Sequence, residues 1–423
     1  MFAQLFFLML ITLITAMAME GPLQSVAEAT IAFFQGVALY ATGLIALYFI
    51  NKKLKKFLSI DQILFFDNIV IFLLLFLLLF PLNSQSLLFA THVPLAQTIG
   101  TAFSLFLYFF ALYACNYSIY RINHPREIAQ KKSSHAVRFL APFTFPFLLA
   151  TFGLNLFGDH WSDSSAGTFL FLLGFAVVTM IFLPPIVVWT WKCPPLDDPP
   201  LATTLDALCQ KTHFSHGGYK IWNVAEDSIT AAIIGIVPRW RYILFTKKLL
   251  DVMSGPSIEA IVAHEIGHNK RKHLWIYPWI LFGMLVVGTY AVQGVALLIP
   301  IDTQLPEWAW DSIGFAVFIA AIALYFRFVF GFFSRQFERQ ADLYIYEAKL
   351  PPQSLIEAFL TLARSLGTTG HEPSWHHYSI RERVDFLNQT IEDPSLIQKH
   401  HRKTYACLIF FTLCLLVLIV LSL

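Results

Sequence analysis

The stretch HEIGHNKRKHLWIYPWI, residues 264–280, joins two histidines, a basic cluster and the beginning of a long apolar run. On a helix, His264 and His268 of this HExxH motif lie on one face, where both rings can bind the same Zn²⁺ ion. Glu265 projects beside them, within reach of a water molecule on that metal. Because the motif precedes the apolar run, we expect a metal site at the membrane surface and not inside a span.

The composition indicates that most of the chain lies in a bilayer. Of the 423 residues, 57% are hydrophobic and 13% are charged, whereas a soluble domain carries about 25% charged residues. The formal net charge of +2 does not point to a nucleic-acid partner. The five cysteines form no CxxC pair, which argues against a zinc ribbon or a redox motif.

Apolar runs long enough to cross a bilayer as helices recur along the whole chain. They lie near residues 2–19, 29–50, 62–82, 96–115, 139–157, 166–191, 274–299, 312–333 and 404–423. Residues 1–18 end in an Ala-Met-Ala triplet that resembles a signal-peptide cleavage site, but they lack a positively charged start. We therefore interpret them as an uncleaved first span.

The charge of the loops alternates from one crossing to the next. The segments after the second, fourth, sixth and eighth runs are rich in Lys and Arg, whereas residues 83–95, 158–165 and 300–311 contain none. By the positive-inside rule, residues 192–273 and 334–403 are expected on the cytoplasmic face.

These two polar stretches are predicted to form one small α+β domain. The first is expected to contain a helix at 201–211, strand-like pieces at 219–225 and 229–246, and a helix from about 256. The second is expected to contain helices at 334–349, 353–366 and 379–390. The remaining regions are an N-terminal membrane region of about six spans (1–191), two further spans (274–333) and a last span (404–423).

A catalytic zinc site needs a third protein ligand and one open position. A metzincin would have a histidine at position 274, but this chain has Leu274, and His273 falls at a spacing that those motifs do not use. Glu338 in SRQFERQAD (334–342) is the best candidate, because two crossings return the chain to the face that carries the histidines. Asp342 lies one turn further along that helix and can accept the second N–H of a ligating histidine.

Three blocks of this sequence resemble the integral-membrane zinc metallopeptidases that include type I CAAX prenyl proteases and bacterial HtpX-type proteases. The blocks are EAIVAHEIGHNKRKH (259–273), SRQFERQAD (334–342) and HHYSIRERVDFL (376–387). The resemblance implies one zinc ion per chain. It also implies roles for individual residues: His264, His268 and Glu338 as zinc ligands, Glu265 as the general base, and Asp342 as the acid that holds a ligating histidine.

The resemblance further implies that His377 and Arg383 flank the active site and that His377 stabilises the oxyanion. The family usually has His-Pro where this chain has His377-Tyr378, so His376 remains a competing candidate.

Thr230 and Ala231 stand where the family usually has Asn-Ala, on an edge strand that holds the substrate backbone. Threonine favours strands and forms hydrogen bonds, but it lacks the paired donor and acceptor of an amide. We therefore expect substrate binding at this strand through the backbone.

The predicted fold is an all-α multi-spanning membrane protein with a small, cytosol-facing α+β zincin domain of gluzincin-like type interleaved with its helices. The predicted function is zinc-dependent endopeptidase activity on peptide or membrane-protein substrates in the bilayer. A site-2-type intramembrane protease would carry its HExxH motif inside a span. A transporter or a metal-binding membrane scaffold is the other alternative, but a structural zinc site does not need Glu265.

Overall fold

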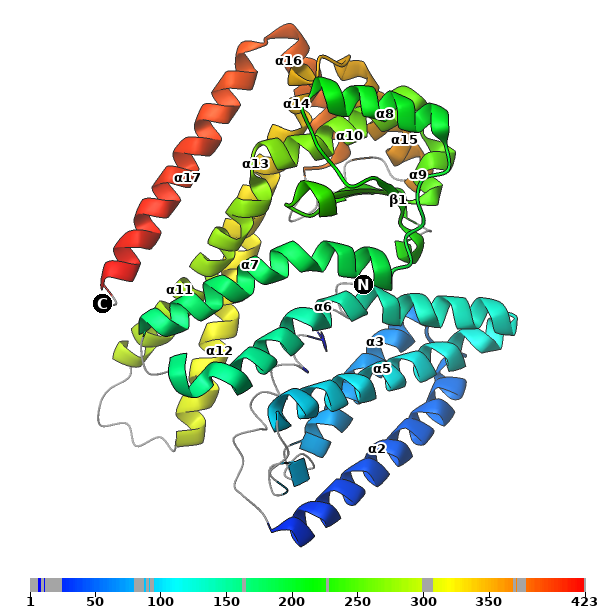
Figure 1. Ribbon diagram of the computed structural model, residues 1–423, viewed down its shortest axis with the longest axis vertical. Helices are drawn as coiled ribbons and strands as arrows, with labels where there is room; N and C mark the ends of the chain where they lie inside the picture. Colours follow the sequence, from blue (N-terminus) through cyan, green and yellow to red (C-terminus); the bar gives the residue numbers. More distant parts are fainter. Residues whose placement is uncertain are drawn as a thin grey trace. The chain divides into compact units, whose positions relative to one another are not determined.

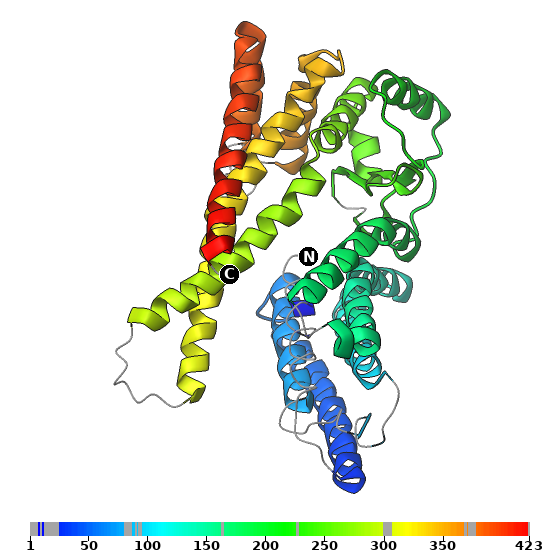
Figure 2. The ribbon, with the colours of Figure 1, turned by 60° about the vertical axis from the view of Figure 1, so that its left-hand side comes forward.

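The computed structural model describes residues 7–8, 11, 25–79, 87–88, 91, 95–161, 165–225, 228–298, 307–367, 370 and 378–421. The described chain is helical apart from one small sheet (Figures 1 and 2). It divides into two compact units: residues 1–194 with 222–225, and residues 195–221 with 226–423.

The first unit is a bundle of long helices. They are α2 (Val26–Leu54), α3 (Ile60–Leu79), α5 (Ala96–Asn123), α6 (Arg126–Trp161) and α7 (Ser165–Thr190). Polar side chains buried between them pair with one another: Asn51 donates to Asp67 at 2.8 Å, and the Tyr108 hydroxyl donates to Asn68 at 3.1 Å. Such pairing is required where no water can satisfy polar groups.

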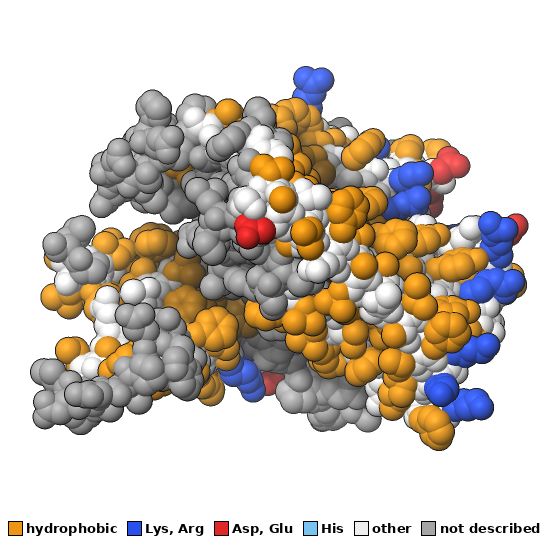
Figure 3. All heavy atoms as spheres, turned by 90° about the horizontal axis from the view of Figure 1, so that it is seen from below, with side chains coloured by type: hydrophobic (Ala, Val, Ile, Leu, Met, Phe, Trp, Pro, Cys, Tyr) orange, Lys and Arg blue, Asp and Glu red, His pale blue; other side chains and the backbone are white. Residues whose placement is uncertain are grey.

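Among the described residues, seven helices are long and apolar enough to cross a membrane. They begin at Val26, Gln62, Ala96, Arg126, His273, Ile313 and Ser395. Helix α7 coincides with a further predicted run, whereas the run at 2–19 lies largely outside the described residues. Hydrophobic side chains cover much of the surface in Figure 3, as lipid-facing helices require. The chain is a multi-pass integral membrane protein.

The sheet of the second unit has three strands: β1 (Tyr219–Ile221), β2 (Ala231–Ile234) and β3 (Tyr242–Phe245). Their order is β1-β3-β2, with β1 parallel and β2 antiparallel to β3, so β2 is an edge strand in the described part of the chain. The piece predicted at 229–246 is thus two strands. The chain turns at Gly235, where φ is +98° and a Cβ would lie 2.4 Å from the carbonyl oxygen of Trp240, so only glycine fits.

Short helices pack around this sheet and share its core. They are α8 (Pro199–Lys211), α9 (Lys247–Val252), α10 (Gly255–Lys270), α14 (Tyr344–Glu347), α15 (Pro352–Leu366) and α16 (Ile380–Glu392). The core is apolar and includes Leu205, Phe245, Val262 and Leu355. Helix α13 (Gly331–Asp342) packs on α10, but its Phe333 and Phe337 belong to a second apolar cluster with Ile280 and Tyr325. The sequence did not predict α9, and the helix predicted at 334–349 is interrupted between α13 and α14.

Three long helices carry the second unit into the membrane: α11 (His273–Leu298), α12 (Glu307–Tyr325) and α17 (Ser395–Leu421). A π-helical segment, η3 (Phe326–Phe330), joins α12 to α13, so the span leads directly into the helix that carries Glu338. Helix α17 packs on α11 and α13 and begins at Ser395, well before the predicted span at 404. No glycine or proline interrupts the stretch between Ser395 and that position.

Candidate metal centre and active site

Helix α10 presents both histidines of the HExxH motif. The Ser254 side chain caps its N-terminus, and a proline occupies its first turn, where the missing N–H has no helical partner. His264 is buried, with 8% of its surface exposed. Gly267 lies against the junction of α13 and α14, where a Cβ would approach Tyr344 Cβ to 2.7 Å and Ala341 Cα to 3.1 Å. The absence of a side chain therefore lets α10 and α13 come close.

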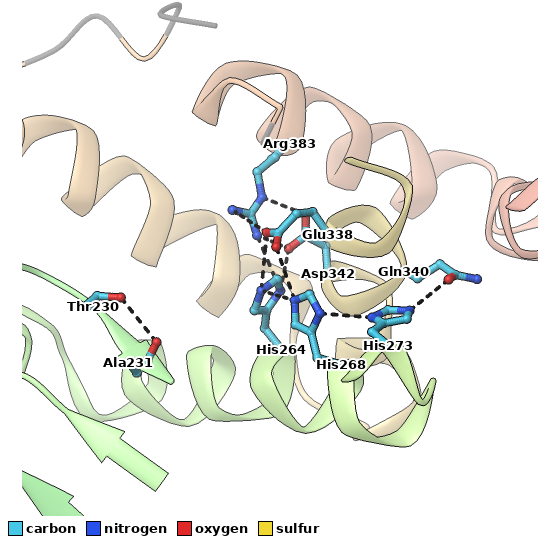
Figure 4. A network of polar contacts seen from close by, with 9 residues as sticks. All are labelled: Thr230, Ala231, His264, His268, His273, Glu338, Gln340, Asp342 and Arg383. Carbon is cyan, nitrogen blue, oxygen red and sulfur yellow. Dashed lines mark hydrogen bonds and ion pairs between the residues drawn. The ribbon is translucent and has the colours of Figure 1, made fainter. Parts of the chain in front are cut away.

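Three side chains from α10 and α13 converge on one point (Figure 4). The Nε2 atoms of His264 and His268 are 3.3 Å apart, and the Glu338 oxygens lie 3.7 Å and 3.4 Å from them. Zinc bonds of about 2.0–2.1 Å in a tetrahedron place neighbouring ligand atoms about 3.4 Å apart. The spacing and the donor types both fit zinc, so these residues could hold one ion.

The outer nitrogen of His264 is held by a buried ion pair. Its Nδ1 lies 2.9 Å from an Asp342 oxygen, and Arg383 donates to both oxygens of that carboxylate at 2.5 Å and 2.9 Å. Burial would lower the pKa of Arg383, but the charges of Asp342 and Glu338 outweigh it and raise that pKa above its ordinary value. The Arg383 guanidinium also covers the Phe359 ring at 4.1 Å. The structure thus brings Asp342 and Arg383 together beside His264.

The outer nitrogen of His268 meets a neutral partner. His268 Nδ1 lies 3.0 Å from His273 Nδ1, and His273 Nε2 lies 3.1 Å from Gln340 Oε1 (Figure 4). Sequence reasoning tested His273 only as a metal ligand and missed Gln340. The turn at Lys272, where φ is +59°, folds His273 back toward the site. The only sequence signal for this role was that a histidine stands at the beginning of a membrane helix.

Glu265 stands between two cavities beside the converging donors. A cavity of about 530 Å³ is bordered by Glu265, Glu338 and the edge of the sheet, and a smaller one of about 240 Å³ by Glu265, His268 and Ile233. The half-buried Glu265 therefore borders two cavities next to the candidate metal position. A general base needs this access to water and substrate.

The predicted substrate strand lies beside this site. Thr230 and Ala231 line the larger cavity, and β2 contacts α10. The Thr230 hydroxyl donates to the Ala231 carbonyl at 3.3 Å, and the Thr230 backbone pairs with Thr246. The side chain of Thr230 is thus engaged locally. His377 and its competitor His376 lie outside the described residues.

The chain is similar to known proteins. Residues 195–391 match the profile of Peptidase family M48. A protein named "Protease HtpX homolog", from Tropheryma whipplei strain TW08/27, is 25% identical over 185 residues, which are 42% of this chain and 62% of that relative. The chain thus spans less than two thirds of that relative's length. The crystal structure of S. mikatae Ste24p is 17% identical, with a TM-score of 0.48, and the match covers 85% of this chain and 98% of that one.

Proposed function

Because residues 195–391 match Peptidase family M48, we propose that the chain is a membrane-embedded, zinc-dependent endopeptidase. The observation that carries the proposal is the convergence of His264, His268 and Glu338, whose ligand atoms are 3.3–3.7 Å apart. Glu265, which a purely structural metal site would not need, lies beside them and borders both cavities.

Each residue of the site has a distinct role in this proposal. A zinc ion held by the three donors would supply Lewis acidity and make water a nucleophile near neutral pH. Glu265 takes a proton from the attacking water and delivers it to the leaving amine. Asp342 keeps the Nδ1 proton on His264 and so leaves Nε2 free to ligate. Arg383 fixes the Asp342 carboxylate in place.

His377 is proposed to stabilise the developing oxyanion. Support comes from its neighbour Tyr378, which lines the larger cavity and accepts a hydrogen bond from Gln336 of α13 at 3.0 Å. His377 directly precedes Tyr378 in the sequence, and His376 remains its competitor.

The substrate is proposed to bind as an extended peptide along the free edge of β2. Edge strands offer unpaired backbone groups that a peptide can meet by strand addition. The larger cavity next to this edge has an apolar wall that includes Leu355, Phe359 and Leu362 of α15. We therefore infer that an apolar side chain near the scissile bond enters this cavity, as expected for peptide or membrane-protein substrates at the bilayer.

The charge pattern supports placing this site on the cytoplasmic face. Three basic residues, Lys270, Arg271 and Lys272, stand where α10 gives way to the membrane helix α11. Lys399, Arg402 and Lys403 lie in the first turns of α17. Basic residues at the ends of spans favour the cytoplasmic side.

The decisive experiment compares wild type with Glu265→Gln in detergent, measuring zinc content and cleavage of an unstructured reporter peptide. We expect one zinc per chain in both proteins, and loss of cleavage by a factor of about 10²–10⁴ in the variant. Chelator should abolish cleavage by wild type. Equal cleavage by both proteins would refute the mechanism. Zinc in both without cleavage in either, together with metal-dependent transport in liposomes, would favour a transporter.

A further inference from the structure

We propose that His273 and Gln340 are positioning residues that fix the tautomer and orientation of the metal ligand His268. They form a hydrogen-bonded chain that runs from the metal centre to the last membrane helix. The inference rests on the proposed metal site. It concerns two residues that are not among the proposed zinc ligands.

The hydrogen-bonded chain passes through four side chains on four helices. After the contacts of His268 with His273 and of His273 with Gln340, the Gln340 amide nitrogen lies 3.2 Å from Nδ1 of His401. These residues belong to α10, α11, α13 and α17, and all lie in the second unit. The ligand on α10 is thereby tied to the three helices that surround it.

The metal position determines the direction of both hydrogen bonds that His273 makes. His268 turns Nε2 toward His264 and Glu338, so its proton resides on Nδ1 and is donated to His273 Nδ1. Neutral His273 then carries its own proton on Nε2 and donates it to Gln340 Oε1. The Gln340 amide nitrogen in turn lies against His401 Nδ1, while Arg271 lies against the other ring nitrogen of His401. Both contacts of His273 therefore join one donor to one acceptor.

The middle of the chain is rigidly packed. His273 and Gln340 are each 1% exposed, and the His273 ring stacks on Phe337 with centroids 4.3 Å apart and planes 13° apart. Polar groups buried this deeply are retained at a cost unless they are paired. The second N–H of a metal-bound histidine usually needs an acceptor that orients the ring. His273 supplies that acceptor for His268, as Asp342 does for His264.

Two substitutions of His273 separate its hydrogen-bonding role from its packing role. His273→Phe keeps the ring that stacks on Phe337 but removes the acceptor. His273→Asn removes the ring but places an amide oxygen close to the position of Nδ1. Zinc dissociation constants are measured by chelator competition on the purified full-length chain, and cobalt(II) absorption spectra report ligand geometry.

We expect His273→Phe to weaken zinc binding about 10–100-fold, the usual effect of losing an outer-shell partner, and to alter the cobalt spectrum. His273→Asn should bind zinc within a few-fold of wild type, although its metal-free form should unfold at a lower temperature. The opposite order, with unchanged affinity in His273→Phe and weak binding in His273→Asn, would overturn the proposal.

Gln340→Met provides a second test if His273→Phe does not fold. It removes the acceptor that holds His273 and should weaken zinc binding several-fold. The matched control is Gln336→Met, the same change on the same helix at a buried amide that bonds Tyr378 instead. Equal zinc affinities in Gln340→Met and Gln336→Met would refute the proposed role of the hydrogen-bonded chain. A wild-type protein without zinc would refute the proposed function itself, whereas zinc binding and cleavage with unaffected variants would refute only this inference.

Discussion

Asp342 links the candidate metal site to the buried side chains around it. It accepts hydrogen bonds from the candidate ligand His264 and from Arg383, and it is 2% exposed. Arg383 is enclosed as well, with Phe359 against its guanidinium. Neither charge has ready access to solvent, so each depends on the other for its stability.

Asp342→Asn tests this dependence. The amide still has an acceptor for His264, but Arg383 loses the carboxylate that it contacts most closely and keeps only Glu338, at 3.5 Å. We expect the free energy of unfolding of the metal-free protein to fall by about 3–5 kcal/mol, as for other broken buried ion pairs. Zinc affinity should fall about 10–100-fold. Chemical unfolding and chelator competition measure the two effects.

Asp342→Asn with Arg383→Met is the control for that experiment. Removal of the arginine removes its buried charge, so the double variant should be more stable than Asp342→Asn alone. If the two proteins unfold together, the ion pair does not explain the loss.

The residues predicted from the sequence are those whose roles follow from short spacing or from topology. His264 and His268 share a helix face because they are four residues apart. Glu338 was selected because two membrane crossings return the chain to the same side. His273 and Gln340 could not be chosen in this way. Their contact depends on the turn at Lys272 and on the packing of α11 against α13, which no short motif specifies.

At the scale of elements, the contact between α10 and α13 sets the distance between the histidines and Glu338. We expect Gly267→Ala to force these helices apart, because its Cβ would meet backbone atoms of Ala341 at 3.1 Å. Alanine favours a helix by about 1 kcal/mol, but overpacking costs about 1–3 kcal/mol. Zinc affinity should therefore fall. The free energy of unfolding should stay about the same or decrease.

Gly255→Ala is the matched control at the start of the same helix. A Cβ there meets nothing within 4 Å, so zinc affinity should remain that of wild type. Equal zinc affinities in the two alanine variants would show that close packing at Gly267 does not position Glu338.

The edge strand β2 allows backbone and side-chain recognition to be separated. Thr230 pairs with Thr246 across the ladder, so alternation along an antiparallel strand directs the backbone groups of Ala231 and Ile233 toward the free edge. We expect Ile233→Pro, which removes one outward N–H, to raise KM for a peptide about tenfold or more without changing zinc content. Thr230→Val should change KM only slightly.

Ile233→Ala controls for the lost side chain in this comparison. It keeps the outward N–H, so its KM should stay close to that of wild type. A large effect of Thr230→Val with none of Ile233→Pro would instead assign recognition to the threonine hydroxyl.

At the scale of the whole molecule, hydropathy located the spans well because lipid selects long apolar helices wherever they occur. The small α+β domain was less predictable. Its second strand piece proved to be a hairpin that turns at Gly235, and α9 is too short to show a clear period. Helix α17 begins early because helix formation depends on the backbone and continues through polar residues that hydropathy assigned to a loop.

The metal would join segments that lie far apart in the chain. The histidines stand before α11 and Glu338 stands after α12, so zinc closes a loop that contains two membrane helices. A ligand that binds only the folded state stabilises it by about 2.7 kcal/mol at 100 times its Kd. We therefore expect chelator to lower the unfolding temperature of wild type and of Glu265→Gln equally, because Glu265 is not a ligand. Glu338→Gln should show a much smaller change. A chelator effect as large in Glu338→Gln as in wild type would remove Glu338 from the metal site and leave the two halves of the domain joined by packing alone.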